Sequence, residues 1–183
     1  MKFTPDAALA AKSNDELVAL FAAPAPWPLW HIIETLALRG SDMIDAALRG
    51  LQHPHPQVRR WCAELMDQHG DERCVEPLLA LLDDPVAHVR WQAIHSLGCQ
   101  RCKAAPLNVQ QHVTQRMTEL ILSDPSTRVR SEALVALTLQ TEAATPEVMA
   151  AVRAYQADLS SRERTSKRER AFLRGLKAVT CAS

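Results

Sequence analysis

Two cysteines and two histidines are the residues in this chain best suited to metal or redox chemistry. Cys99 and Cys102 form a Cys-x-x-Cys motif, with His95 before it and His112 after it. Thiolates and imidazoles at such spacing can bind zinc, and a cysteine pair at a helix end can also be redox-active. A single motif, with no second copy and no thioredoxin-like strand pattern, defines neither site. We therefore assign no metal or cofactor, and keep a lyase-type or metal-assisted activity at these four residues as an alternative.

The rest of the sequence lacks the common catalytic motifs. It contains no glycine-rich phosphate loop, no G-x-S-x-G and no H-E-x-x-H. The 21 basic and 21 acidic side chains give zero formal net charge, which provides no general case for nucleic-acid binding. These features predict a protein that is not an enzyme and that functions through a surface.

The elements that position the cysteines and histidines belong to a repeated pattern. The phrase Pro-x-x-x-Val-Arg starts at Pro54, Pro85 and Pro125, so its copies are 31 and then 40 residues apart. Residues 100–108 account for the longer interval and are expected to form a loop. A period of this length is typical of a solenoid in which each repeat is one helix pair.

Apolar residues follow helical spacing, as in Val89, Ala93 and Leu97. First helices are expected at 41–51, 71–82 and 109–122, and second helices at 56–69, 86–99 and 126–139. Four glycines near helix ends are expected to adopt left-handed caps: Gly40, Gly50, Gly70 and Gly98. The sequence predicts an all-α fold, an α-α superhelix (solenoid) of about five helix pairs. It forms one domain, 1–183, with approximate repeats 12–40, 41–70, 71–100, 108–140 and 145–180.

An acid precedes the proline in two of the three phrases. Asp84 lies six residues before Arg90 and Asp124 six before Arg130, whereas His53 replaces the acid in the first copy. With the adjoining Pro, Val and Ala residues, this pattern resembles the HEAT repeat family, in particular the short bacterial HEAT-like repeats also found in phycobilisome lyases. The resemblance implies a hydrogen-bonded ladder between neighbouring repeats, made by Asp84, Arg90, Asp124, Arg130 and Arg59. We expect these residues to be structural.

The second helices of such stacks usually line the concave side, where partners bind. The position after each ladder residue reads His31, Arg60, Trp91 and Ser131, and Glu64 and His95 lie one turn further on. Tryptophan and arginine are enriched in binding hot spots. We predict a non-enzymatic scaffold that binds a protein partner through the concave-face residues His31, Arg60, Trp61, Glu64, Trp91 and His95. Trp91 is expected to be the most exposed tryptophan, and Glu64 to orient Arg60.

Charge is concentrated near the carboxy terminus. Residues 160–183 carry seven basic and two acidic side chains, which makes the last helix either a solvated cap or a site for an acidic partner, an anionic surface or nucleic acid. The amino-terminal segment does not resemble a signal peptide, and no apolar stretch is long enough to span a membrane. With five cysteines expected to be reduced, the predicted location is cytoplasmic.

Overall fold

The computed structural model describes residues 3–99, 102–103, 107, 111–139 and 146–161, and every regular element in these ranges is helical. The α-helices are α1 Ala7–Ala10, α2 Asn14–Ala19, α3 Leu29–Ala37, α4 Ile44–Gly50, α5 Pro56–His69, α6 Val75–Ala80, α7 Ala87–Gly98, α8 Gln111–Ser123, α9 Thr127–Leu139 and α10 Pro146–Ser161. Four 3-10 helices accompany them: η1 Leu20–Ala22, η2 Gly40–Met43, η3 Glu72–Cys74 and η4 Leu81–Asp83. The predicted all-α fold is confirmed.

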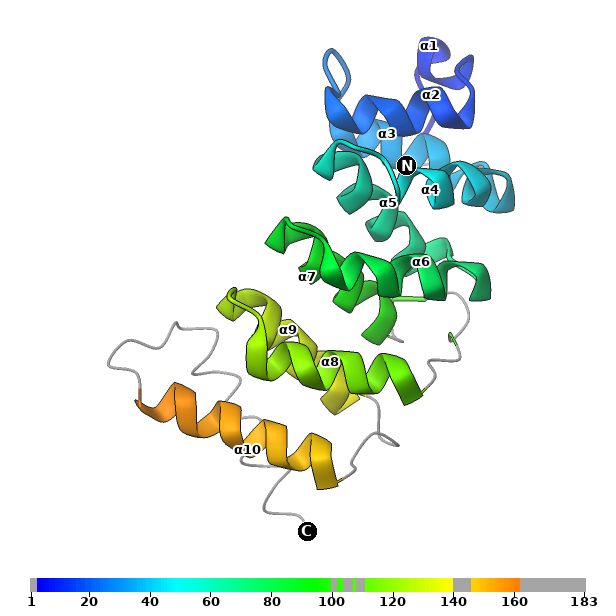
Figure 1. Ribbon diagram of the computed structural model, residues 1–183. Coiled ribbons are helices and arrows are strands. Elements are labelled where there is room, and N and C mark those ends of the chain that lie inside the picture. Colours follow the sequence, from blue (N-terminus) through cyan, green and yellow to red (C-terminus); the bar gives the residue numbers. More distant parts are fainter. Residues whose placement is uncertain (1–2, 100–101, 104–106, 108–110, 140–145, 162–183) are drawn as a thin grey trace.

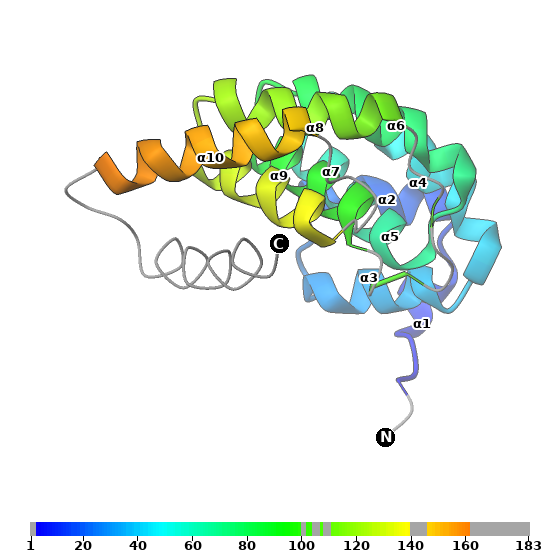
Figure 2. The ribbon, with the colours of Figure 1, turned by 90° about the horizontal axis from the view of Figure 1, so that it is seen from below.

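The helices stack as a two-layered solenoid (Figure 1). The first helices of successive pairs are α2, α4, α6, α8 and α10, and the second helices are α3, α5, α7 and α9. Seen from below, α4, α6 and α8 follow one side of the stack and α3, α5, α7 and α9 the other (Figure 2). The second helix of the repeat predicted at 145–180, the basic last helix, lies outside the described residues.

The second helices are continuous, whereas the first helices are shorter and flanked by 3-10 turns. Helix α5 has the predicted bounds and begins at Pro56, where a missing amide proton costs no helical hydrogen bond. The helix expected at 71–82 is divided into η3, α6 and η4. Pro77 lies in α6 and cannot donate an amide proton to the preceding turn, which fits the change to 3-10 geometry before it.

The core lies between the two layers. Val89, Ala93 and Leu97 are buried on α7, as the apolar spacing predicts, and the equivalent residues of α9 are buried with them. Small residues on these helices allow close contact. A β-carbon added to Gly98 would lie 2.3 Å from the β-carbon of Ala136, so Gly98 is required for the approach of α7 to α9.

The expectation that four glycines form left-handed caps is wrong for three of them. Only Gly40, with φ of +57°, adopts the left-handed conformation. Gly50 and Gly98 lie at the ends of α4 and α7 and are needed for close packing against neighbouring side chains, Cys62 in the case of Gly50. Gly70 has an extended backbone and also faces a close neighbour, Cys74. Sequence position alone did not separate these two uses of glycine.

Arg90 joins the third repeat to the fourth. Its Nε and Nη2 donate to Oδ2 and Oδ1 of Asp124 at 2.7 and 2.9 Å, and its Nη1 donates to the backbone carbonyl of Asp84 at 2.7 Å. The Arg90 side chain is 10% exposed and that of Asp124 only 2%. The backbone amide of Ser126 also donates to Asp124 Oδ1 at 2.8 Å, so this carboxylate caps the start of α9 as well.

The same arrangement recurs one repeat earlier. Arg59 donates twice to Asp84, at 2.6 and 3.0 Å, and donates to the backbone carbonyl of His53 at 2.8 Å. Because that last bond uses a backbone oxygen, it does not require an acid at position 53. Each arginine therefore binds a carbonyl of its own repeat and the carboxylate of the next.

The pairing is weaker at both ends of the described stack. Arg130 donates to the carbonyl of Asp124 at 2.7 Å, but its Nη2 lies 3.9 Å from Asp158. At the other end, Trp30 occupies the arginine position on α3 and His53 the acid position before α5. The first junction thus lacks both members of an Arg–Asp pair.

Candidate functional site

The residues predicted for partner binding lie on the second helices. His31 is on α3, Arg60, Trp61 and Glu64 are on α5, and Trp91 and His95 are on α7. All six side chains are partly buried. We call them, together with Trp30, the second-helix row.

Trp30 is the most exposed tryptophan at 55%, so the expectation that Trp91 would be the freest is wrong. The Trp30 ring packs edge-on against His31, with centroids 3.9 Å apart, and against Phe3 at 5.6 Å. In the repeat register Trp30 takes the position that arginine has in the later repeats. Because position 53 holds a histidine and not an acid, an arginine at position 30 would have no carboxylate to bind, and a tryptophan can occupy position 30 instead.

Arg60 lies over the ring of its neighbour Trp61, 4.2 Å from the centroid. The Arg60 Nε is buried and has no hydrogen-bond partner among the described residues. Among the described residues no ion pair is found between Arg60 and Glu64, so the orienting role of Glu64 stays a prediction. Packing against Trp61 positions Arg60 in this structure.

Trp91 is held by side chains of both α7 and α9. The Arg128 guanidinium of α9 lies 4.0 Å from the centroid of the Trp91 ring, and the His95 ring stacks with it at a centroid distance of 6.0 Å. The indole Nε1 donates to Glu132 Oε2 at 2.7 Å. Sequence spacing placed Trp91 away from the Val89–Ala93–Leu97 face, but it could not show that α9 supplies Arg128 and Glu132 to enclose the ring.

His95 joins this aromatic group to a cluster of possible metal ligands. The hydrogen bond that His95 makes to the Glu132 carboxylate, the principal cause, and the charge of Asp67 raise the pKa of His95, and burial opposes this. Three of the four residues in the sequence hypothesis come together here, since His95, Cys99 and Cys102 share the cluster with Asp67.

The fourth residue of that hypothesis, His112, is placed on α8, and its side chain lies outside the described residues. Asp67 on α5 was not predicted as a candidate. It lies 28 residues before His95, and no motif links the two. The available signal was an acid in the last turn of a helix that is otherwise apolar on its inward face.

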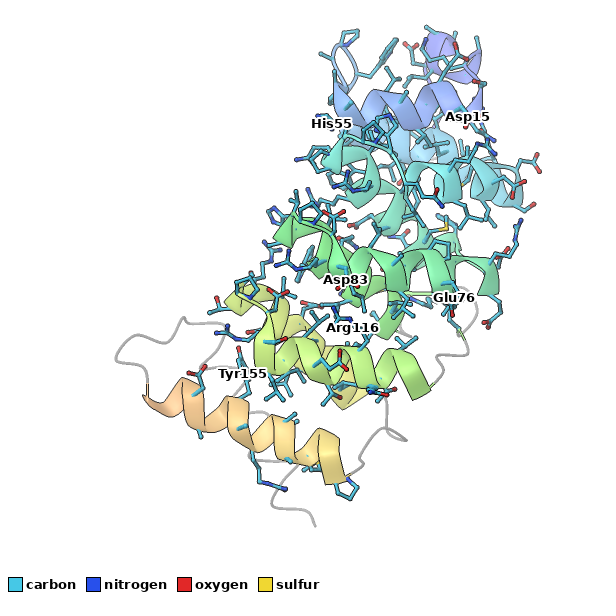
Figure 3. All side chains as sticks on the ribbon, viewed as in Figure 1. Asp15, His55, Glu76, Asp83, Arg116 and Tyr155 are labelled. Carbon is cyan, nitrogen blue, oxygen red and sulfur yellow. The ribbon has the colours of Figure 1, made fainter. Side chains whose placement is uncertain are left out.

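The first-helix layer carries ion pairs that the sequence analysis did not predict. Arg116 of α8 pairs with Asp83 of η4, and Figure 3 shows these two side chains directed toward each other. Arg49 of α4 pairs with Asp15 of α2 at 2.8 Å in the same layer. These pairs are exposed and connect neighbouring repeats, so they add little stability individually.

The basic segment proposed for an acidic partner, an anionic surface or nucleic acid lies largely in residues 162–183, outside the described part of the chain. Within the described ranges, no helix has both the length and the apolar character needed to cross a bilayer.

Comparison with known proteins agrees with the repeat pattern. A family model described as HEAT repeats matches residues 14–98 and 44–138, a span from α2 to α9. Among solved structures, the chain is similar to a designed armadillo repeat protein in complex with the peptide (KR)4. The two are 16% identical, the match covers 92% of this chain and 90% of the other, and the TM-score is 0.41. Neither comparison points to the narrower phycobilisome-lyase type.

Proposed function

Because the chain belongs to the HEAT repeat family, we propose that it is a non-enzymatic adaptor that binds another protein through its second-helix layer. Solenoids of this kind present extended surfaces that need little reorganisation on binding. A preformed surface reduces the entropy lost when a partner docks.

One observation carries this proposal. Three successive second helices each present a tryptophan beside a cationic or imidazole side chain: Trp30 with His31, Trp61 with Arg60, and Trp91 with Arg128. Tryptophan and arginine are the residue types most enriched in binding hot spots. Their recurrence from repeat to repeat favours an elongated partner segment that contacts several helices in turn.

Trp30, Arg60 and Trp91 have different roles in the proposed partner binding. Trp30 is the main apolar anchor because it is exposed, and Arg60 is the main polar anchor because its partly exposed guanidinium lies over the Trp61 ring. Trp91 has a structural role in the binding surface, because its ring is already in contact with Glu132, His95 and Arg128. The guanidinium groups of Arg60 and Arg128, each over a tryptophan ring, favour a partner segment carrying carboxylates or free backbone carbonyls.

A site-specific photo-crosslinking experiment tests the proposed face. A photoreactive amino acid is placed at Trp30 in one protein and at Leu122 in another, since both residues are exposed, at 55% and 58%, but Leu122 lies on α8 in the opposite layer. The partner identified from the Trp30 crosslink is then purified, and its affinity is measured for Trp30→Ala, Arg60→Ala and Leu122→Ala.

We expect Trp30→Ala and Arg60→Ala each to weaken binding at least about tenfold, as truncation of hot-spot residues does. Leu122→Ala should change the affinity less than about twofold, because solvent-exposed contacts outside a hot spot contribute little. Circular dichroism spectra and melting temperatures should be nearly unchanged for Trp30→Ala. Crosslinking of the same partner from Leu122 alone, or equal weakening by all three substitutions, would contradict the proposed face.

A further inference from the structure

Four side chains with metal-binding atoms meet beside the second-helix row. Asp67 lies in the last turn of α5, His95 in the last turn of α7, Cys99 at the C-cap of α7 and Cys102 in the segment that follows. One ligand atom from each lies within 4.8 Å of every other. Helices α5 and α7 are neighbours in the stack (Figure 1), so the cluster joins two repeats and the start of the connection to α8.

The His95 ring is oriented for coordination. Its Nδ1 lies 2.9 Å from Glu132 Oε1, and Glu132 is itself held by the Trp91 indole. Its Nε2 therefore faces the cluster, 3.6 Å from Asp67 Oδ2 and 3.8 Å from Cys102 Sγ. A carboxylate on the second nitrogen is the usual partner of a metal-binding histidine, because it fixes the tautomer and increases the basicity of the ring.

Asp67 is oriented in the same way. Lys103 Nζ binds Asp67 Oδ1 at 3.2 Å, which leaves Oδ2 directed at His95. The Lys103 ammonium also donates to the backbone carbonyl of Cys99 at 3.1 Å, and its side chain is only 2% exposed. A buried lysine thus fixes both the carboxylate and the chain end that carries the first cysteine.

The distances suit one small tetrahedral ion. Ligand atoms about 2.0–2.3 Å from zinc stand about 3.3–3.8 Å apart at tetrahedral angles, which includes the 3.6 and 3.8 Å separations from His95 Nε2. Cys99 Sγ and Cys102 Sγ are 3.0 Å apart and would have to separate by about 0.8 Å. We propose that Asp67, His95, Cys99 and Cys102 form a structural zinc site.

The charge of the cluster is compatible with the ion. Without metal, two neutral thiols accompany the Asp67 carboxylate and the Lys103 ammonium. When zinc binds, each thiol releases one proton and His95 coordinates through Nε2 as the neutral imidazole, giving up any proton on that nitrogen, so two thiolates offset the two positive charges of the ion and no electron is transferred. The buried lysine and carboxylate remain balanced in both states, which avoids the large cost of an uncompensated buried charge.

The donor set indicates zinc and a structural role. Two thiolates and one imidazole favour zinc over magnesium or calcium, which prefer oxygen ligands. Four protein ligands leave no open position for a substrate, as in structural rather than catalytic sites. The ion would fasten the start of the longer connection between the third and fourth repeats onto α5 and α7, which is separate from any role in partner binding.

The test measures metal binding by the full chain. Reduced, metal-free protein is titrated with zinc in competition with a chromophoric chelator and, separately, with Co²⁺, whose bond to thiolate gives a charge-transfer absorption. The variants are Cys102→Ser, in an exposed residue, and Glu132→Gln. Cys74→Ala and His88→Gln serve as matched controls, because both lie outside the cluster.

We expect one zinc ion per chain, a Co²⁺–thiolate band, a higher melting temperature with zinc, and loss of tight binding in Cys102→Ser. Glu132→Gln should weaken the affinity about 10–100-fold, as second partners of histidine ligands do. Both controls should bind as the native protein does. Absence of zinc binding by the reduced chain, or equal affinity in Cys102→Ser, would overturn the site. A Cys99–Cys102 disulfide whose reduction restores no metal binding would overturn it as well.

Discussion

Replacing Arg90 with methionine is expected to lower the free energy of unfolding by about 3–5 kcal/mol, because it removes one partner of a buried ion pair. Three hydrogen bonds are lost, two to Asp124 and one to the carbonyl of Asp84. The Asp124 side chain, 2% exposed, then keeps its charge, and among the described residues the Ser126 amide is the hydrogen-bond donor that remains to it. Methionine has a similar length and fills much of the space, so the loss reports mainly the uncompensated charge.

Arg49→Met is the matched control. Arg49 binds Asp15 with the same two-pronged geometry, at 2.8 and 3.0 Å, but both side chains are 62% exposed. Water stabilises either charge when its partner is removed, so this variant should lose less than about 1 kcal/mol. The two substitutions differ in burial and hardly at all in chemistry.

Urea unfolding followed by far-UV circular dichroism measures both variants and the double variant Arg90→Met/Asp124→Asn. The asparagine oxygen can still accept from the Ser126 amide but carries no charge, so the double variant should recover more than half of the loss. The reasoning is refuted if Arg90→Met costs no more than Arg49→Met, or if the double variant is less stable than Arg90→Met alone.

Two further predictions concern the second helices. Gly98→Ala should cost about 1–3 kcal/mol in denaturant unfolding, because its β-carbon would overlap Ala136; adding Ala136→Gly should regain part of this, and a neutral Gly98→Ala would refute the close contact. Partial burial, with the charges of Arg128 and Arg60, lowers the pKa of His88 below its ordinary value of 6.5. The folded protein therefore binds this proton less readily than the unfolded chain, and stability present above pH 6.5 is lost as the pH falls below it. His88→Gln should make the melting temperature depend less on pH below pH 6.5. An unchanged pH dependence in this variant would contradict the lowered pKa of His88.

The Pro-x-x-x-Val-Arg phrase predicted the fold well because its residues make the hydrogen bonds that join one repeat to the next. The arginine at its end must reach both its own chain and the next repeat, and this requirement keeps the six-residue spacing from Asp84 to Arg90. Helix boundaries followed for α5, where Pro56 marks the start. They were less accurate around α6, since apolar spacing does not distinguish a continuous helix from short 3-10 and α segments.

Side-chain surroundings were harder to predict because they depend on contacts between distant repeats. The repeat register gave the position of Trp91, but its enclosure depends on Arg128 and Glu132, which are 37 and 41 residues away. Asp67 was missed for the same reason, because an isolated acid in a helix has no sequence signature until the neighbouring helix brings His95 beside it.

The missing Arg–Asp pair at the first junction affects how the stack can deform. Arg59 and Arg90 join the next two junctions through buried carboxylates, whereas among the described residues no Arg–Asp pair links α3 to α5 at the equivalent place, and the ion pair that does cross the first junction, Arg49 with Asp15, is exposed. Apolar contacts are non-directional and tolerate small rotations that a two-pronged ion pair does not. The first junction is therefore more compliant than the two junctions joined by Arg59 and Arg90, and Trp30 lies on it. A partner that binds Trp30 would fix the angle between the first and second repeats. The curvature of the solenoid at this end can therefore adapt to the partner without breaking a buried ion pair.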